Sequence, residues 1–198
     1  MRVAGAVLAA GAGRRMGGPK AELVVAGQRL VDRAVGALVA AGCDPVLAVV
    51  RAGVHVPGAV VVVNPAAERG QRSSLELAVA AAEEGGVEAL AVILVDQPDV
   101  TAADVAAVVA AWRPGRVAVG ATHPVVMATE SWRAALAVAG PDEGARAYLA
   151  ARPDLVDRVR RNDARSVADL DTPADVAARE SRLGSPSPQA RDTFPTGE

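Results

Sequence analysis

The sequence predicts a three-layer α/β fold, in which helices cover both faces of a mostly parallel central sheet. Short aliphatic runs without polar alternation recur along the chain, as expected for strands buried on both faces. Segments with apolar residues at helical spacing separate these runs, and such alternation forms parallel sheets through right-handed crossovers. The apolar content of 51% comes mainly from Ala and Val, with only four aromatic residues, which suits helices packed closely on a sheet.

Length and composition restrict the class of protein. The 198 residues fit one domain, which we expect over residues 1–183, and the Ser/Pro/Gly-rich residues 184–198 are expected to be disordered. A net charge of −2 with scattered basic residues argues against a nucleic-acid partner, and Cys43, the only cysteine, excludes a disulfide framework. No apolar run reaches the roughly 18–20 residues that span a bilayer, and the N-terminal run leads into a loop instead of a signal cleavage site. We therefore expect no membrane segment and a cytoplasmic protein.

The elements of the first half follow in order from these patterns. An uninterrupted apolar run over residues 3–10 predicts the first strand. Apolar residues at helical spacing over residues 30–39 predict the first helix, which Gly42 ends. The aliphatic runs at residues 46–50 and 59–63 predict the second and third strands, both buried on two faces.

The second half of the chain continues this alternation. Apolar spacing over residues 75–82 predicts a helix, and the seven apolar residues 89–95 predict the fourth strand. Thr101 and Asp104 have the spacing of a capping box, which starts a helix that ends near residue 111. Residues 117–119 predict a fifth strand, and two further helices are expected, after Arg146 and after Thr172.

A glycine-rich loop follows the first strand. Four glycines and a proline lie within residues 11–19, next to two arginines and Lys20. Exposed N–H groups with cations beside them, at the end of a strand, form a natural phosphate site, although a plain surface turn would share this composition. Lys20 is the only lysine beside twenty arginines, and an ammonium is not interchangeable with a guanidinium, so we interpret it as functional.

The spacing of this loop excludes two familiar phosphate-binding motifs. The third glycine of a dinucleotide fingerprint would fall at position 16, but it lies at Gly17, and Arg51 follows the second strand where a ribose-binding acid is expected. A P-loop needs Gly-Lys-Ser/Thr, whereas Pro19 precedes Lys20 and Ala21 follows it.

The loop instead fits the pattern L-A-A-G-x-G-x-R-M-G-x-x-K over residues 8–20. This pattern resembles the signature loop of nucleotidyltransferases with a Rossmann-like three-layer α/β/α fold, most closely the molybdenum cofactor cytidylyltransferase-like branch. The resemblance implies that the loop wraps a nucleoside triphosphate. The implied catalytic residues are Arg15 and Lys20, and the implied nucleotide-binding residues of the loop are Leu8, Ala9, Ala10, Gly11 and Gly13.

A second segment resembles the family motif that borders the base and ribose. It runs from Asn64 through Gly70 to Ser74, and the resemblance implies that these three residues bind the nucleotide. Asn-Pro is also a good opening for a turn, and serines at the start of a helix are usually caps, so both structural interpretations stay open.

Two aspartates are the metal ligands that the resemblance implies, with Mg²⁺ as the cofactor. Asp96 follows the fourth predicted strand in the motif Asp-Gln-Pro, at the same sheet edge as the first loop. Asp171 lies in the segment D-L-D-T-P-A-D, where Thr172 and Asp175 explain the start of a helix without explaining the additional acid.

The residues that the resemblance places on the acceptor side are His123, Pro124, Asp142 and Arg146. This part departs from the family pattern, because Thr122 stands for a glycine, Met127 stands for a phenylalanine, and the segment before His123 looks shorter. Arg146 could equally be a solvated arginine near a helix start.

The implied reaction transfers CMP from CTP to a phosphate-bearing acceptor such as molybdopterin, with release of pyrophosphate. CTP is favoured because residues 8–11 read closer to the cytidylyl than to the guanylyl type, and a transient contact with a molybdenum enzyme is a further implied partner. The alternatives are a guanylyltransferase of the same pathway, a sugar- or polyol-phosphate nucleotidyltransferase, and a non-catalytic nucleotide-binding chaperone for a molybdenum enzyme.

Overall fold

The computed structural model describes residues 2–161 and 168–184, and it confirms the α/β class with a mostly parallel sheet. The strands are β1 (Val3–Leu8), β2 (Val24–Val25), β3 (Gln28–Arg29), β4 (Val46–Val50), β5 (Val60–Val63), β6 (Ala89–Leu94), β7 (Val117–Val119), β8 (Val125–Ala128) and β9 (Val156–Arg158). The helices are α1 (Leu30–Ala40), α2 (Gln71–Glu84), α3 (Ala102–Ala111), α4 (Thr129–Val138), α5 (Arg146–Ala151) and α6 (Pro173–Gly184). The predicted disordered tail lies, except for residue 184, outside the described residues.

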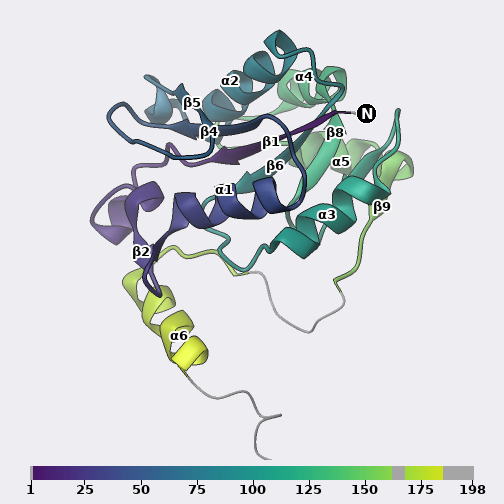
Figure 1. Cartoon of the computed structure of the whole chain (residues 1–198). Coiled ribbons are helices and arrows are strands. Elements are labelled where there is room, and N and C mark those ends of the chain that lie inside the picture. The colour runs from purple at the N-terminus through teal and green to yellow at the C-terminus, as the bar shows by residue number, and fades with distance from the viewer. Residues whose placement is uncertain (1, 162–167, 185–198) are drawn as a thin grey trace, which may run out of the picture.

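Seven strands form the central sheet in the order β5-β4-β1-β6-β8-β7-β9. The first four are parallel, and Val7 in β1 lies opposite Ala48 in β4 and Ile93 in β6. β8 runs antiparallel to both β6 and β7, and β9 returns parallel to β7. The carboxyl ends of the four parallel strands therefore meet at one edge, where the loop after β1 also lies (Figure 1).

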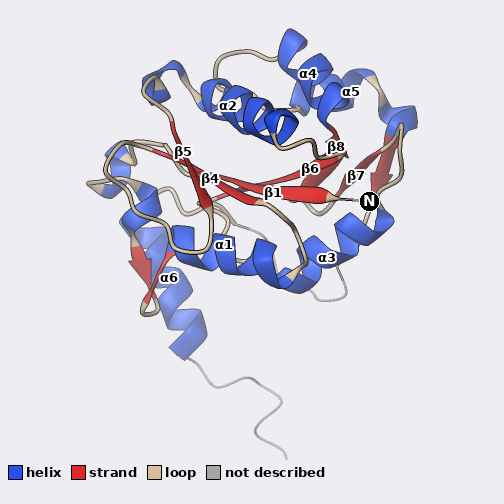
Figure 2. Ribbon diagram, turned by 45° about the horizontal axis from the view of Figure 1, so that its top comes forward, coloured by secondary structure: helices blue, strands red, loops and turns tan. Residues whose placement is uncertain are grey.

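Helices cover both faces of this sheet. α1 and α3 lie on one face, and α2, α4 and α5 lie on the other (Figure 2). Side chains of β1 alternate between the two layers, with Val7 in the core under α1 and Leu8 in the core under α2. The packing under α1 is close, because a Cβ atom on Gly5 would lie only 2.9 Å from a methyl carbon of Leu38.

The predicted burial of the third strand on both faces is wrong. β5 is the edge strand of the sheet, and the exposed fractions of Val60 and Val63 are 55% and 45%. An aliphatic run predicts a strand from local sequence, but its place at the centre or edge of a sheet depends on pairings that no local pattern encodes.

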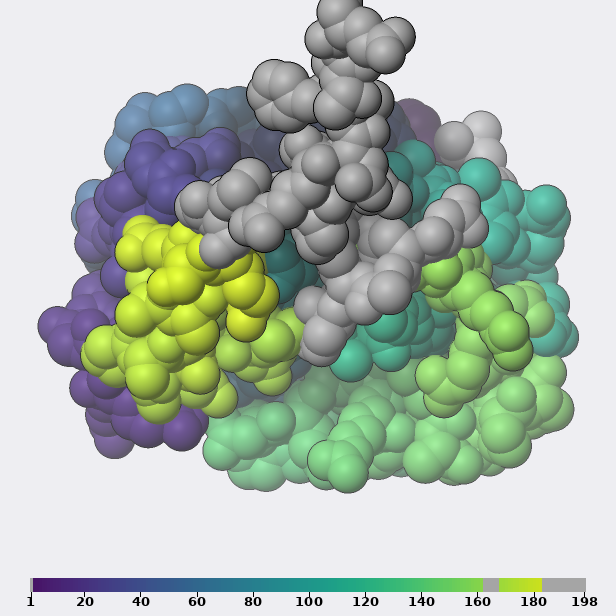
Figure 3. Space-filling view, turned by 90° about the horizontal axis from the view of Figure 1, so that it is seen from below, coloured from purple at the N-terminus to yellow at the C-terminus, as the bar shows by residue number. Residues whose placement is uncertain are grey.

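The C-terminal segment returns to the edge of the sheet at which the parallel strands end. Leu170 is 2% exposed, and its backbone N–H donates to the carbonyl oxygen of Asp96 over 2.8 Å. α6 continues from this anchor and packs beside the N-terminal part of the chain (Figure 3), where Glu180 accepts a hydrogen bond from the backbone N–H of Ala26 over 3.2 Å. None of the helices in the described ranges is long and apolar enough to cross a membrane.

Candidate active site

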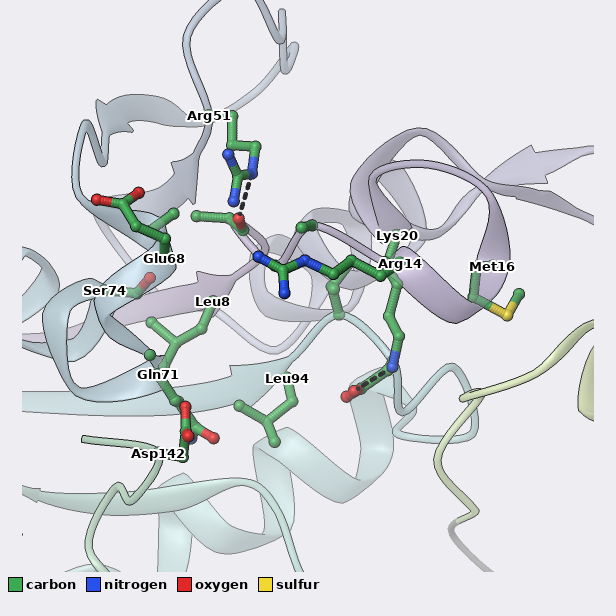
Figure 4. Close-up of a pocket in the computed structure, with 18 of the residues that line it drawn as sticks. Leu8, Arg14, Met16, Lys20, Arg51, Glu68, Gln71, Ser74, Leu94 and Asp142 are labelled. Carbon is green, nitrogen blue, oxygen red and sulfur yellow. Dashed lines mark hydrogen bonds and ion pairs between the residues drawn. The ribbon is translucent and has the colours of Figure 1, made fainter. Parts of the chain in front are cut away.

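A cavity of about 540 Å³ opens at the carboxyl ends of β1, β4 and β6 (Figure 4). The predicted site residues that line it are Leu8, Ala10, Gly11, Gly13, Arg15, Lys20, Gly70, Ser74, Asp96, Asp142 and Asp171. Two predicted nucleotide-binding residues, Ala9 and Asn64, are buried and are not part of this lining. The fold thus gathers predicted site residues from five separate parts of the sequence around one cavity.

Gly13 and Gly11 of the first loop are required to be glycine by different features of the structure. Gly13 has φ 58°, and a Cβ atom there would lie 1.9 Å from the carbonyl oxygen of Gly18, so a side chain cannot fit. Its carbonyl oxygen accepts a hydrogen bond from the N–H of Met16 over 2.8 Å, which closes a turn. Gly11 has no atom within 4 Å of its Cβ position, so its backbone faces open space that a ligand can approach closely.

Lys20 connects the two predicted metal ligands. Its ammonium donates to Oδ2 of Asp96 over 2.9 Å and to Oδ1 of Asp171 over 2.7 Å. Arg15 adds a weaker contact, with its Nη2 atom 3.8 Å from Oδ1 of Asp171. The side chain of Lys20 is 14% exposed, whereas those of Asp96 and Asp171 are 24% and 42% exposed. One largely buried cation thus bridges two carboxylates at the foot of the glycine-rich loop.

These contacts shift the ionisation of the cluster. Burial lowers the pKa of Lys20, but the hydrogen bonds to Asp171 and Asp96 outweigh it, so its pKa lies above the ordinary 10.5. The hydrogen bond from Lys20 lowers the pKa of Asp171 below its ordinary 3.8. Lys20 is therefore charged, and Asp171 ionised, across the neutral pH range.

The carboxylates of Asp96 and Asp171 fit a divalent cation. Oδ1 of Asp96 is buried and has no hydrogen-bond partner in the described part of the chain, so one carboxylate oxygen is available beside the cavity. No group of three or more His, Cys, Asp or Glu side chains suited to a metal exists within residues 2–161 and 168–184. A site with two carboxylates suits Mg²⁺, which prefers oxygen ligands and keeps several waters.

The cap of α6 does not use the carboxylate of Asp171. Thr172 and Asp175 form the reciprocal contacts of a capping box, in which Oδ2 of Asp175 accepts from the N–H of Thr172 over 2.7 Å. The same oxygen accepts from the backbone N–H of Asp171 over 3.0 Å, which leaves the side chain of Asp171 directed to Lys20. The capping box therefore accounts for Thr172 and Asp175, and the ion pair with Lys20 accounts for Asp171.

Asn64 acts within the fold as a turn residue. Its side-chain amide donates to the hydroxyl oxygens of Ser73 and Ser74, over 2.9 Å each. Its Oδ1 atom accepts from the N–H of Ala66 over 2.9 Å. The side-chain polar atoms thus hold the turn after β5 and the start of α2 together, as the turn interpretation expects, and a direct nucleotide contact stays a prediction.

Gly70 marks the junction with the acceptor side. Its φ is 95°, and a Cβ atom there would lie 2.4 Å from both Oδ1 of Asp142 and the carbonyl oxygen of Pro141. The N–H of Arg72 donates to the same carbonyl over 3.0 Å. The segment that carries Asp142 is therefore pressed against the start of α2, which brings its carboxylate to the cavity.

A second cavity of about 660 Å³ adjoins the first through the shared residues Gln71, Leu94 and Asp142. His123 and Arg146 line it, together with Arg158 and an apolar wall from β7, β8 and α5, whereas Pro124 is buried outside the lining. Arg146 and Arg158 form no ion pair with residues in the described ranges. The adjoining space thus offers two cations and an apolar surface to a second substrate.

His123 is held neutral in this second cavity. Burial lowers the pKa of His123 to about 4, so the imidazole carries no charge at neutral pH. Its Nδ1 atom is buried and lacks a hydrogen-bond partner in the part of the chain that the structure describes. A ligand group in the cavity could satisfy this nitrogen.

Comparison with known proteins decides the family. Residues 5–159 match the MobA-like NTP transferase domain family. The chain belongs to this family. Nicotine blue oxidoreductase of Paenarthrobacter nicotinovorans is 33% identical over 190 residues, which cover 86% of the chain and 92% of that protein. A probable molybdenum cofactor guanylyltransferase of Opitutus terrae is 39% identical over 103 residues, about half of each protein. A nucleotidyl transferase structure from Methanothermobacter thermautotroptrophicus shares the fold with a TM-score of 0.77, at 19% identity over 92% of the chain and 97% of its own.

The first cavity of this MobA-like NTP transferase domain also has lining residues that were not among the predicted site residues. Arg51, Glu68 and Gln71 line the first cavity. Arg51 follows β4 directly, so the rule that selected Asp96 at the end of β6 could have selected it too. Gln71 and Glu68 lie in or near the segment between Asn64 and Ser74, but no local pattern distinguishes side chains that face the cavity there.

Proposed function

We propose that this protein transfers a nucleoside monophosphate from a nucleoside triphosphate to a phosphate-bearing acceptor and releases pyrophosphate. The observation that carries the proposal is the cluster of Lys20, Asp96 and Asp171 beside the glycine-rich loop. A loop with exposed N–H groups suits phosphates, and paired carboxylates suit the Mg²⁺ that neutralises them. The family match supports the same reaction class.

The chain's own residues supply positioning and charge. The loop around Gly11 and Gly13 binds the triphosphate, and Arg15 and Lys20 stabilise the negative charge of the departing pyrophosphate. Asp96 and Asp171 would hold Mg²⁺, which withdraws charge from the phosphates when bound. An oxygen of the acceptor phosphate attacks the α-phosphorus, and the bond from that phosphorus to the pyrophosphate oxygen breaks. The acceptor phosphate is already ionised, so no strong general base is required.

The second cavity supports an anionic acceptor. Arg146 and Arg158 offer charge-assisted hydrogen bonds to a phosphate, and the adjoining apolar wall suits a ring system. Asp142 lies between the two cavities and His123 presents its neutral imidazole to the second, so both could contact the acceptor. We propose molybdopterin as this acceptor, with CTP as the donor and a molybdenum enzyme as the transient recipient of the product.

A specific observation favours a second candidate function. The relative named nicotine blue oxidoreductase matches 86% of the chain at 33% identity, so an oxidoreductase that uses the same nucleotide cavity for a dinucleotide is the alternative. The pair of carboxylates around Lys20 favours transfer, because hydride transfer from a nicotinamide needs no metal-binding carboxylates at the phosphates.

The test is to incubate the protein with each of the four triphosphates, Mg²⁺ and molybdopterin, and to measure pyrophosphate release. We expect release with CTP, and at least a ~10-fold loss in Asp96→Asn, the scale on which even indirect metal partners act. Glu84→Gln, on the exposed end of α2, is the matched control that should keep full activity. A preference for GTP above tenfold would replace the cytidylyl assignment by a guanylyl one. Reduction of nicotine blue by NADH or NADPH, without pyrophosphate release from any triphosphate, would favour the oxidoreductase.

A further inference from the structure

Arg51 stands at the end of the first cavity that is remote from Lys20. In the sheet order β5-β4-β1-β6, Arg51 follows β4 and Glu68 follows β5, whereas Asp96 follows β6 on the other side of β1. Neighbouring strands are about 4.7–4.9 Å apart, so the ends of β4 and β6 are roughly 10 Å apart. Figure 4 shows Arg51 and Glu68 at one end of the cavity and Lys20 at the other. A triphosphate at Lys20 therefore directs its base toward Arg51.

The guanidinium of Arg51 is oriented by the phosphate loop itself. Its Nε atom donates to the carbonyl oxygen of Ala10 over 2.8 Å. That contact fixes the plane of the guanidinium at the point where β1 becomes the loop. Neither Nη atom forms a hydrogen bond or ion pair with a residue in the described ranges, and the side chain is part of the cavity wall. A pair of parallel donors is thus free at the base end of the cavity.

We propose that Arg51 selects the nucleotide base by this pair of donors; the proposal rests on the triphosphate site proposed above. Two parallel N–H groups need two adjacent acceptor atoms on the ligand. Cytosine offers O2 and N3, and guanine offers O6 and N7. Adenine places its amino group beside N7, and uracil places its N3–H between two oxygens, so neither base accepts both hydrogen bonds. The inferred specificity is for cytosine or guanine nucleotides over those of adenine and uracil.

Glu68 supplies the complementary acceptor. Its carboxylate is exposed and lines the same end of the cavity as Arg51. Cytosine carries an amino group beside N3, and guanine carries the N1–H and amino donors, so either base can donate to a carboxylate while Arg51 donates to it. The donors of Arg51 and the acceptor of Glu68, on one wall of the cavity, therefore both select cytosine and guanine.

The experiment measures binding alone, so that it does not depend on the acceptor. Isothermal titration in Mg²⁺ gives Kd for CTP, GTP, UTP and ATP, with inorganic tripolyphosphate as a probe of the phosphate end. We expect CTP or GTP to bind the wild type at least tenfold more tightly than both UTP and ATP. In Arg51→Met this ratio should fall below threefold, with the Kd for tripolyphosphate unchanged. Arg69→Met removes an exposed charge next to Glu68 but outside the cavity, and should keep the wild-type ratio.

The possible outcomes separate this inference from the proposed function. If the wild type binds neither tripolyphosphate nor any nucleotide, the proposed triphosphate site itself fails, and the base-selection inference fails with it. If nucleotides bind without base preference, or if Arg51→Met keeps the wild-type ratio, base selection by Arg51 is wrong while the phosphate site stands. Equal weakening of tripolyphosphate and nucleotides in Arg51→Met would mean that Arg51 only holds the loop through Ala10, which also overturns the inference. Arg51→Lys keeps the charge but not the paired donors, and it should lose the base preference as Arg51→Met does.

Discussion

Replacing Lys20 by methionine should destabilise the protein, because Asp96 and Asp171 lose the cation that bridges them. The ammonium makes hydrogen bonds of 2.9 and 2.7 Å to Asp96 and Asp171. Hydrogen bonds to charged groups contribute about 1.5–3 kcal/mol each, but Asp171 is 42% exposed, so solvent screening reduces its share to about 1 kcal/mol or less. The variant should therefore lose about 2–3 kcal/mol, because Asp96 is left largely buried without its cation. For a chain of this size the loss corresponds to roughly 4–12 °C in Tm.

The assay is thermal unfolding at pH 7 and low salt, with and without Mg²⁺. The Lys20→Met variant lacks the cation between the carboxylates, so Mg²⁺ alone should restore part of its lost stability and raise the Tm of the wild type less. Arg69→Met is the control for a surface charge and should stay within about 0.5 kcal/mol of the wild type. A Lys20→Met variant that unfolds within about 0.5 kcal/mol of the wild type would refute the energetic account of the cluster.

The same cluster gives a pH window. Asp171 has a lowered pKa, so its stabilising contribution is complete above its ordinary 3.8 and is lost as the pH falls through the lower folded value. Lys20 has a raised pKa, so its contribution is complete below 10.5 and is lost as the pH rises through the higher folded value. The difference in stability between wild type and Lys20→Met should accordingly be constant from about pH 4 to 10.5 and shrink outside that range.

Three further variants or probes test separate parts of the structure. Gly13→Ala should destabilise the protein by at least about 1 kcal/mol in urea unfolding, because its Cβ atom would lie 1.9 Å from a backbone carbonyl oxygen. Gly11→Ala should be as stable as the wild type and should weaken only nucleotide binding. Equal stability of the two variants would contradict this prediction. His123 has a pKa of about 4 against an ordinary 6.5, so the free energy of unfolding should decrease as the pH falls from 6.5 to 4. His123→Gln should reduce this dependence on pH, whereas His55→Gln, at an exposed site, should leave it unchanged. Burial raises the pKa of the Cys43 thiol to about 11, so a disulfide reagent at pH 8 should modify it at least ~10-fold more slowly in the folded protein than in urea, and rapid modification would show that the thiol is accessible.

Local patterns in the sequence predicted much of the fold. Aliphatic runs predicted β1, β4, β5 and β6 because strands of a parallel sheet are hydrophobic throughout. The strands β2, β3, β8 and β9 were not predicted, since two to four residues give little pattern, although the equally short β5 and β7 were recognised as aliphatic runs. The exposure of Val60 and Val63 in β5 was missed for another reason, since an edge strand and a central strand can have the same composition.

The site was predictable where strand ends converge. The first loop and Asp96 follow neighbouring parallel strands, so their meeting follows from topology. The contact of Asp171 with Lys20 spans 151 residues, and physical reasoning from sequence alone could not establish it. The second cavity depends on antiparallel strands and α5, which bring Arg146 and Arg158 beside His123, and no spacing in the sequence encodes that assembly.

The most direct test of nucleotidyl transfer follows the label of the donor nucleotide. CTP labelled in its α-phosphate, incubated with the protein, Mg²⁺ and molybdopterin, should pass the label to the acceptor, whereas CTP labelled in its γ-phosphate should release the label as pyrophosphate. Asp96→Asn should lower both signals at least ~10-fold. Transfer of the γ-label to the acceptor, or no transfer of the α-label from any of the four triphosphates, would contradict the account.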